Sequence, residues 1–439
     1  MKDPQPRLLI ICPSMWPRMR TWGETQRMFY LANDLSKSGW EVFTLSPDFS
    51  CDTDLYSKSG CFSSYFPNRC SRKKQDAQER IQENGTFVLP RFLQTLAAHT
   101  ITPIVKWLYN EPDCYEGLSK QLWIWKNRSE IRRLLREINY DVLIISAPSF
   151  VLFRFAEKVK KINASIPVIL DYRDPWHLWN RKKNFAYLTE KRRLRYADAV
   201  VGFSEIFAKD MEQVFHLPKG KCRVVYNGYS EADWSAAESR YAPPFERTPG
   251  KLYLVFTGNL SFWASENNYR NPFPLIETVR TFPDAELYFV GIQGRPPDIY
   301  YDNVHFIGNV SQETSFHYML ASDILISIHD AKDDSGTYLV SGKFYDYMRS
   351  GRVIWHIGRP QDLMSDWIRR YQLGITCSND PSGLKASLEL LIQEHERDRL
   401  HMLRKRNMKL IKDFSREMQN SRYETFLRSI YKNKRLGGF

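Results

Sequence analysis

The chain has 439 residues, of which 43% are hydrophobic, so it is long enough for two domains and too apolar for wholesale disorder. No apolar run approaches the roughly 18 residues that span a bilayer, and we expect no secretory signal at the start of the chain. Lysine and arginine exceed aspartate and glutamate by 63 to 50, and this net charge of +13 favours nucleic acid, anionic lipid or phosphorylated small molecules as partners. The seven cysteines are scattered without a C-x-x-C pair, so we expect reduced thiols, no metal site and a cytoplasmic location.

The first half of the chain alternates short apolar runs with amphipathic segments. A buried-type strand over 8–12 precedes a helix whose apolar residues between Met28 and Leu35 recur at helical spacing, and this helix stops at Gly39. Residues 50–130 break the alternation and are interpreted as an insertion. Further strands are predicted over 42–45, 142–145, 168–170 and 199–203, with helices over 153–161 and 206–215.

A second alternating series begins after a predicted linker at Ala242-Pro243-Pro244. Alternation of this kind is typical of parallel sheets with helices on both faces. The predicted fold class is therefore α/β, with two Rossmann-like, doubly wound domains facing a cleft, where such sheets bind ligands at the carboxyl ends of their strands. The strands of this series are predicted over 252–256, 287–290, 304–307, 324–328 and 353–356, and its helices over 272–281, 311–321, 342–350 and 384–393.

Two polar loops follow strands of the first domain. Gly23 and Glu24 precede the first helix, where a glycine lets backbone N–H groups approach an anion, although a plain structural turn explains the loop equally well. The loop is not G-x-G-x-x-G, so no dinucleotide site is indicated. The second loop, Asp171-Tyr172-Arg173-Asp174-Pro175-Trp176, directly follows a strand, which places its charges at the cleft. The alternative is an Arg–Asp pair that only fixes the loop.

The second domain carries the triplet Ser341-Gly342-Lys343 at the start of a predicted helix. Free amides at a helix start and a lysine ammonium together form a phosphate site. Asp346, one turn later on the same face, is placed to accept hydrogen bonds from a ribose. A P-loop is excluded because no glycine stands five residues before Gly342 and no strand immediately precedes it. A charged surface helix is the alternative.

In chain order, these segments resemble a bacterial GT-B glycosyltransferase of the family 4 type over nearly the whole length of the sequence. Each segment is a modest signal alone, and the set in this order is fairly specific. The segments that carry the resemblance are the loop at Gly23, the Asp171-x-Arg173-Asp174-x-Trp176 signature, ADAVVGFSE (197–205), VVYNGY (224–229), the strand end Phe256-Thr257-Gly258-Asn259-Leu260, and YLVSGKFYDYMRSG (338–351).

The resemblance implies a division of labour between domains. Residues 1–242 are expected to bind the acceptor and residues 243–412 a nucleotide-diphosphate sugar. Residues 413–439 are expected to form a helix that crosses back to the N-terminal domain. The implied activity is that of a hexosyltransferase-type enzyme, whose nucleotide sugar is a co-substrate and which needs no cofactor.

The resemblance also assigns donor-binding residues, with two departures from the family pattern. Asp346 stands where many relatives have a Glu that holds the donor ribose, whereas Tyr338 replaces the first Glu of the same motif. After the strand that ends in Thr257-Gly258, Asn259 replaces an expected Arg. Lys343, beside Ser341 and Gly342, is therefore expected to carry more of the diphosphate charge.

The implied mechanism neutralises the leaving diphosphate with a helix dipole and basic side chains rather than a metal ion. Several relatives have a His where Arg173 stands here, which leaves Arg173 and Asp174 as the candidate catalytic residues, with Asp174 a possible base. Retention of the anomeric configuration is expected.

The resemblance implies a glycan or lipid-linked acceptor and a role in cell-surface polysaccharide or glycolipid synthesis at the inner face of the cytoplasmic membrane. The apolar, proline-interrupted segment over 87–109, followed by Trp123 and Trp125, suits peripheral contact with lipid headgroups, although a core helix pair explains it nearly as well.

Two other functions remain open. A GT-B-fold epimerase would share the donor site and would turn over a nucleotide sugar with no added acceptor. A basic nucleic-acid-binding protein without catalysis fits the charge of +13 and the 14% aromatic content, but no known motif supports it, and we expect no nucleic-acid partner. Salt-sensitive binding to nucleic acid, independent of any nucleotide sugar, would favour the nucleic-acid-binding protein.

Overall fold

The computed structural model describes residues 5–19, 22–48, 61–67, 114–179, 185–260, 269–292, 300–330, 335–405 and 407–436. Its chain divides into two compact units. The N-terminal unit contains the described residues up to Val225 together with those from Asn420 onward, and the C-terminal unit contains Tyr226 to Gln419. The predicted domain boundaries, after residues 242 and 412, differ from these divisions, and helix α9 (Glu231–Ser239) lies between the first predicted boundary and the observed one.

The N-terminal unit is built on a seven-stranded sheet in the order β3-β2-β1-β4-β5-β6-β7. Every neighbouring pair is parallel, and Leu9 of β1 is in register with Phe43 of β2 and Leu143 of β4. All six residues of β4 are buried, as expected for a strand covered on both faces. The strands are β1 (Arg7–Ile11), β2 (Glu41–Leu45), β3 (Ser63–Tyr65), β4 (Val142–Ala147), β5 (Val168–Tyr172), β6 (Ala199–Gly202) and β7 (Cys222–Val224).

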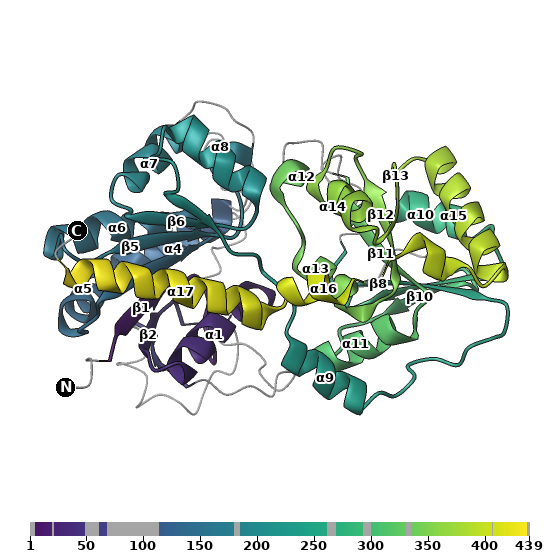
Figure 1. Cartoon of the computed structure of the whole chain (residues 1–439), viewed down its shortest axis with the longest axis horizontal. Coiled ribbons are helices and arrows are strands. Elements are labelled where there is room, and N and C mark those ends of the chain that lie inside the picture. The colour runs from purple at the N-terminus through teal and green to yellow at the C-terminus, as the bar shows by residue number, and fades with distance from the viewer. Residues whose placement is uncertain are drawn as a thin grey trace, which may run out of the picture. The chain divides into compact units, whose positions relative to one another are not determined.

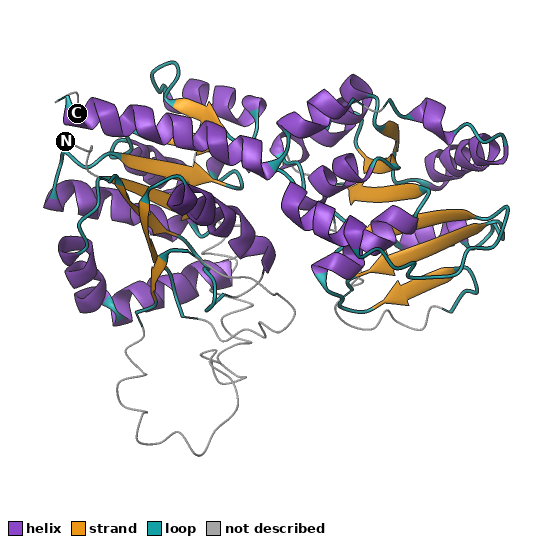
Figure 2. Cartoon of the chain, turned by 60° about the horizontal axis from the view of Figure 1, so that its bottom comes forward, coloured by secondary structure: helices purple, strands orange, loops and turns teal. Residues whose placement is uncertain are grey.

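Helices flank this sheet (Figures 1 and 2). The last of them, coloured yellow in Figure 1, packs on the N-terminal unit, where Asn420 donates to Asp34 at 2.7 Å and Lys434 pairs with Asp141 at 3.2 Å. The helices are α1 (Trp22–Lys37), α4 (Cys114–Lys126), α5 (Arg128–Glu137), α6 (Arg154–Ile162), α7 (Phe185–Leu194), α8 (Glu205–Phe215) and α17 (Arg416–Arg435), with short 3-10 turns η3 (Phe150–Phe153) and η4 (His177–Trp179).

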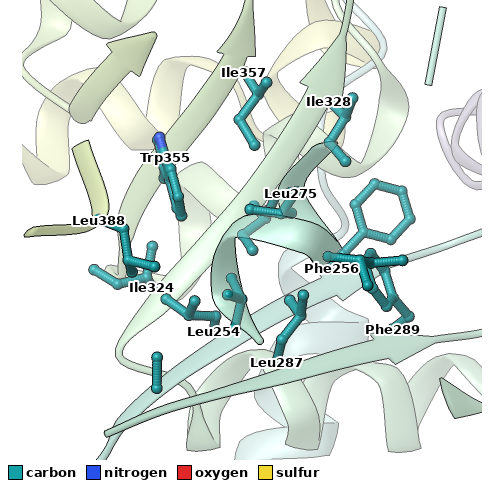
Figure 3. Packing of buried hydrophobic residues seen from close by; sticks show 14 of the residues in the cluster. Leu254, Phe256, Leu275, Leu287, Phe289, Ile324, Ile328, Trp355, Ile357 and Leu388 are labelled. Atoms are coloured by element: carbon teal, nitrogen blue, oxygen red, sulfur yellow. The ribbon is translucent and has the colours of Figure 1, made fainter. Parts of the chain in front are cut away.

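The C-terminal unit is built on a six-stranded parallel sheet in the order β10-β9-β8-β11-β12-β13. Figure 3 shows its core, where Leu254, Phe256 and Leu287 from the strands pack with Leu275 and Leu388 from helices. The strands are β8 (Leu252–Thr257), β9 (Ala285–Val290), β10 (Val304–Ile307), β11 (Ile324–His329), β12 (Val353–Gly358) and β13 (Gly374–Cys377).

Side-chain caps fix where several helices begin. The hydroxyl of Ser204 accepts from the N–H of Phe207 at the start of α8, and Asp380 accepts from two amides at the start of α15. The helices of the C-terminal unit are α9 (Glu231–Ser239), α10 (Phe273–Val279), α11 (Gln312–Ala321), α12 (Ser335–Tyr338), α13 (Gly342–Ser350), α14 (Leu363–Tyr371), α15 (Pro381–Glu396) and α16 (Met408–Asp413), with the 3-10 turn η5 (Leu400–Leu403).

The predicted fold class is confirmed, because both sheets are parallel and flanked by helices. Helix α9 joins the C-terminal unit, since its residue Trp234 is fully buried and stacks on Phe316 of α11. The predicted lipid-contacting segment over 87–109 lies outside the described residues. Within the described ranges, none of the helices is both long and apolar enough to cross a bilayer.

Candidate functional site

The carboxyl end of β8 is fastened to the start of α13. Thr257, the last residue of β8, donates its N–H to the hydroxyl of Tyr347 at 2.9 Å, and its own hydroxyl lies 3.2 Å from the same oxygen. Gly258 follows with a φ of +102°, a left-handed conformation that favours glycine. Its N–H donates to the carbonyl of Val290 at the end of β9. The first turn of α13 and two strand ends therefore meet, as predicted for a ligand site in a doubly wound sheet.

Lys343 places its side-chain amine at this junction. Its Nζ donates to the carbonyl of Thr257 at 2.7 Å and lies 3.4 Å from the centroid of the Phe256 ring. Desolvation, reinforced by the charge of Arg270, lowers the pKa of Lys343 well below its usual range. Among the described residues, no carboxylate forms an ion pair with this side chain. An anion bound here would supply the missing counter-charge and restore the protonated form.

Ser341 and Gly342 add polar groups beside Lys343. Ser341 occupies the N-cap position of α13, but its side chain makes no capping hydrogen bond. Within the part of the chain that the structure describes, its buried Oγ has no hydrogen-bond partner. Gly342 opens the helix, as predicted, and it leaves the backbone amides of the first turn uncovered by a Cβ. The predicted triplet is thus brought together with Thr257 and Gly258.

Asp346 lies one turn after Lys343 and is partly enclosed. One carboxylate oxygen accepts a hydrogen bond from the indole Nε1 of Trp234 at 3.0 Å. Burial raises the pKa of Asp346 to about 6, against the lowering effect of this hydrogen bond and of Arg416. One of the two oxygens of Asp346, the predicted ribose acceptor, therefore already accepts a hydrogen bond from a residue of α9. The sequence did not indicate this contact.

Arg270 is a further basic residue at this site that sequence reasoning missed. It lies close enough for its charge to act on both Lys343 and Tyr347. The loop is anchored by the carbonyl of Tyr269, which accepts from the N–H of Asp330 at 2.7 Å. Asn259, where relatives have an Arg, is exposed at the strand end. The sequence signal that could have identified Arg270 is its position directly before Asn271-Pro272, which precede α10.

In the N-terminal unit, the first residue of the predicted signature is structural. Asp171 is fully buried and forms an ion pair with Arg27 of α1, with contacts of 3.0 and 3.2 Å. The hydroxyl of Ser146 also donates to it, at 3.2 Å. Arg27 additionally donates to the carbonyl of Val225. The carboxylate thus links α1, β4 and β5, and it is not exposed at the surface.

Arg173 is used as a brace between loops. Its guanidinium donates to the carbonyls of Ala147 at 3.3 Å and Pro148 at 2.9 Å, beyond the end of β4, and to the carbonyl of Glu24 in α1. Gly23 is exposed, and a Cβ built on it would meet nothing within 4 Å. The structure therefore brings Gly23, Glu24 and Arg173 together, with space beside the glycine.

Asp174 follows this brace at the carboxyl end of β5 and is partly exposed. The next aromatic residue, Trp176, is buried and stacks on Phe150, with ring centroids 4.9 Å apart and an interplanar angle of 4°. This packing fixes the course of the loop that carries Asp174.

A buried carboxyl that the sequence did not single out supports the same loop. Glu190 of α7 is fully buried and accepts the N–H of His177 at 2.8 Å. Burial raises the pKa of Glu190 to about 8. The hydroxyl of Tyr172 lies next to it, and burial together with the charge of Glu190 raises the pKa of Tyr172. Glu190 is thus largely protonated near neutral pH.

Among the described residues, no three His, Cys, Asp or Glu side chains are grouped so that they could hold a metal ion. The predicted donor site rests instead on a lysine, an arginine, a helix start and strand-end backbone. This chemistry suits an anionic ligand with hydroxyl groups.

Comparison with solved structures shows the same two-domain fold. A glycosyltransferase from Rickettsia africae superposes with a TM-score of 0.61 at 12% identity, covering 98% of this chain and 99% of that one. Anabaena HepE in complex with UDP gives 0.59 at 12% identity, covering 97% and 100%. The catalytic domain of starch synthase IV from Arabidopsis thaliana, bound to ADP and acarbose, gives 0.56 at 12% identity, covering 98% and 99%. No curated protein matches the sequence.

These likenesses define the class of the protein: it has the GT-B fold, with two parallel α/β domains. Within the sequence, residues 86–232 match the family model described as Glycosyltransferase Family 4. Over these residues the chain resembles family 4 glycosyltransferases, and over its whole length it shares the fold of the solved structures.

Proposed function

We propose that the C-terminal unit binds the nucleoside diphosphate of a sugar donor and that the enzyme transfers the sugar to a hydroxyl of a glycan or lipid-linked acceptor bound by the N-terminal unit. The observation that carries the proposal is Lys343. A desolvated lysine beside Arg270, with no carboxylate paired to it among the described residues, is stabilised by an anionic ligand. Solved structures of the same fold with UDP or ADP support a nucleoside diphosphate as that ligand.

The reaction breaks the bond between the anomeric carbon and the diphosphate oxygen, and it forms a bond from that carbon to the acceptor oxygen. The electron pair of the broken bond leaves with the diphosphate, so negative charge grows there as the bond lengthens. Lys343, Arg270 and the amides at the start of α13 stabilise this charge, in the place where a metal ion would otherwise act. We expect the anomeric configuration to be retained.

The proton of the acceptor hydroxyl needs a base, and Asp174 is our candidate. The Arg173 brace and the Trp176–Phe150 stack hold its loop, so Asp174 can keep one position at the end of β5. Asp174→Asn should leave folding and donor binding unchanged and lower turnover by about tenfold or more. Steady-state rates and melting temperatures measure both effects. Normal turnover, or a large loss of melting temperature, would reduce Asp174 to a part of the loop brace.

Purified protein incubated with a panel of nucleotide sugars tests the proposed function. Thermal shift should reveal one preferred base, and release of nucleoside diphosphate should accelerate when an acceptor with a free hydroxyl is added. Interconversion of the nucleotide sugar without any acceptor would instead support an epimerase. If no nucleotide sugar shifts the melting temperature, the donor-site assignment fails.

Exposed apolar residues and basic residues of the N-terminal unit support a further proposal, contact with anionic lipid. Trp125 of α4, and Phe185 and Leu188 of α7, are 61%, 49% and 63% exposed. The charges of Arg132, Arg154 and Arg193 all act on Lys158 of α6, and Arg193 is also paired with Glu157. Aromatic and basic residues together favour the headgroup region. We propose peripheral contact at the cytoplasmic face of the membrane, in synthesis of a cell-surface polysaccharide or glycolipid.

Co-sedimentation with liposomes tests the membrane contact. The protein should bind vesicles that contain anionic lipid at low salt and should dissociate as salt is raised. Trp125→Ser together with Leu188→Ser should weaken binding at every salt concentration. Failure of the unmodified protein to sediment with anionic vesicles at low salt would contradict the proposed contact.

A further inference from the structure

Helix α9 is fastened to the helix that carries Lys343 through side chains of both helices. Trp234 Nε1 donates to Asp346 Oδ1 over 3.0 Å. Arg349, one turn further along α13, forms ion pairs with Glu231 at 2.6 Å and with Glu238 at 2.9 Å. The Arg349 guanidinium also lies 5.6 Å from the centroid of the Trp234 ring. The contact between these helices therefore includes one hydrogen bond to Asp346 and a set of ion pairs that does not involve Asp346.

The indole of Trp234 is a rigid donor. Its side chain is fully buried, and its ring stacks on Phe316 of α11 with centroids 4.3 Å apart. A buried indole N–H requires an acceptor, and the position of the ring determines where that acceptor must lie. The orientation of the Asp346 carboxylate is thus set by α9 rather than by its own helix alone.

The second carboxylate oxygen of Asp346, Oδ2, is available to accept a hydrogen bond from a ligand. Among the described residues, no N–H or O–H group binds Oδ2, and Asp346 is partly exposed. The charged groups that act on the carboxylate are Arg416, which favours its ionised form, and Asp233 of α9, which disfavours it. The Trp234 hydrogen bond also favours the ionised form.

We propose that Trp234 is a positioning residue of the donor site, whose indole N–H holds the Asp346 carboxylate ionised and turned so that its second oxygen accepts a hydrogen bond from a ribose hydroxyl. This inference rests on the proposed function, because it presupposes a nucleotide donor at Lys343. An ionised carboxylate is a stronger acceptor than a neutral carboxyl, so ribose binding weakens once Asp346 is protonated. The pKa of Asp346, about 6, places that change close to neutral pH.

The test is calorimetric titration with UDP or ADP, whichever the wild type binds more tightly, between pH 5.5 and 8.5. Phosphate groups titrate in the same range, so each affinity is divided by that of Asp346→Asn at the same pH. The wild-type ratio should exceed one at high pH and fall with a midpoint near pH 6. Trp234→Phe should move that midpoint upward by about one pH unit, because a hydrogen bond that favours the ionised form is lost.

Glu238→Gln is the matched control, since it weakens the other contact between the same two helices without touching Trp234 or Asp346. Its midpoint should equal that of the wild type. A midpoint unchanged in Trp234→Phe, or moved equally by Glu238→Gln, would overturn the proposal. If Trp234→Phe does not fold, Asp233→Asn serves instead: removal of its charge should lower the midpoint, and an unchanged midpoint would overturn the proposal.

The outcomes separate this inference from the proposed function. If the wild type binds neither nucleotide at any pH, the donor site itself is wrong. If the wild type binds and Lys343→Ala weakens binding, but Asp346→Asn binds equally well at every pH, the donor site stands and the role given to Trp234 and Asp346 falls.

Discussion

Glu190 shows how one buried residue couples stability to pH. The carboxyl has an ordinary pKa of 4.5 and a folded pKa of about 8, raised mainly by burial. Between these values the folded state keeps a proton that the unfolded state has released. The stability associated with protonated Glu190 is therefore fully present below pH 4.5 and is lost as pH rises through about 8.

Glu190→Gln should remove this dependence. Glutamine is neutral at every pH and keeps an oxygen that accepts the N–H of His177. The variant should match the wild type near pH 5 and exceed its free energy of unfolding by about 2 kcal/mol or more near pH 8. Urea denaturation at the two pH values measures this difference. A difference between variant and wild type that is the same at both pH values would show that Glu190 is not protonated in the folded state.

At the scale of elements, the donor site depends on how β8 ends against α13. Gly258 has a left-handed backbone, and a Cβ built on it would lie 3.4 Å from Nζ of Lys343. The left-handed conformation favours glycine at this position, and a methyl group there would contact the amine of Lys343. Gly250, before β8, shares a positive φ, of +83°, but a Cβ at that position would meet nothing within 4 Å.

Gly258→Ala should weaken nucleoside diphosphate binding by about tenfold, because the methyl group takes up space next to Nζ of Lys343, where the diphosphate is proposed to bind. Gly250→Ala is the matched control for the backbone penalty of about 1 kcal/mol that both variants carry. It should lose stability without losing affinity. Calorimetry and thermal melts on the two variants decide the point: equal affinities for the nucleotide would mean that Gly258 matters for conformation alone.

The elements that sequence analysis predicted are those with buried apolar runs. Strands such as β4 and β8 are buried along their whole length, so their composition alone marks them. The edge strands β3, β7 and β13 were missed, because each has only three or four residues and is only partly buried. Helix α13 was placed correctly, since Gly342 opens it and Gly351 ends it in a left-handed conformation.

The missed parts of the site are contacts between distant segments. Trp234 and Asp346 are 112 residues apart, and Arg27 and Asp171 are 144 residues apart. Local patterns indicate a polar loop or a helix start. They do not indicate which distant side chain forms a hydrogen bond or an ion pair with a carboxylate. Asp171 was therefore grouped with Asp174 in one signature, whereas the structure shows a buried ion pair at the first position.

At the scale of the whole molecule, we propose that each unit contributes one half of a transfer reaction. The C-terminal unit combines Lys343 and Arg270 at strand ends, a place for an anionic donor. The N-terminal unit carries Asp174 on a braced loop at the end of β5. The positive charge of the chain, +13, is consistent with anionic partners.

The central claim is that Lys343 binds the diphosphate of the donor, and calorimetry with a panel of nucleoside diphosphates tests it most directly. A charge-assisted contact to phosphate contributes roughly 1.5 to 3 kcal/mol, so Lys343→Ala should bind about ten- to hundredfold more weakly. Lys385→Ala, which removes an exposed lysine of the same unit, should bind as the wild type does. An affinity of Lys343→Ala that is unchanged for every nucleotide the wild type binds would contradict the donor site and the glycosyl transfer proposed from it.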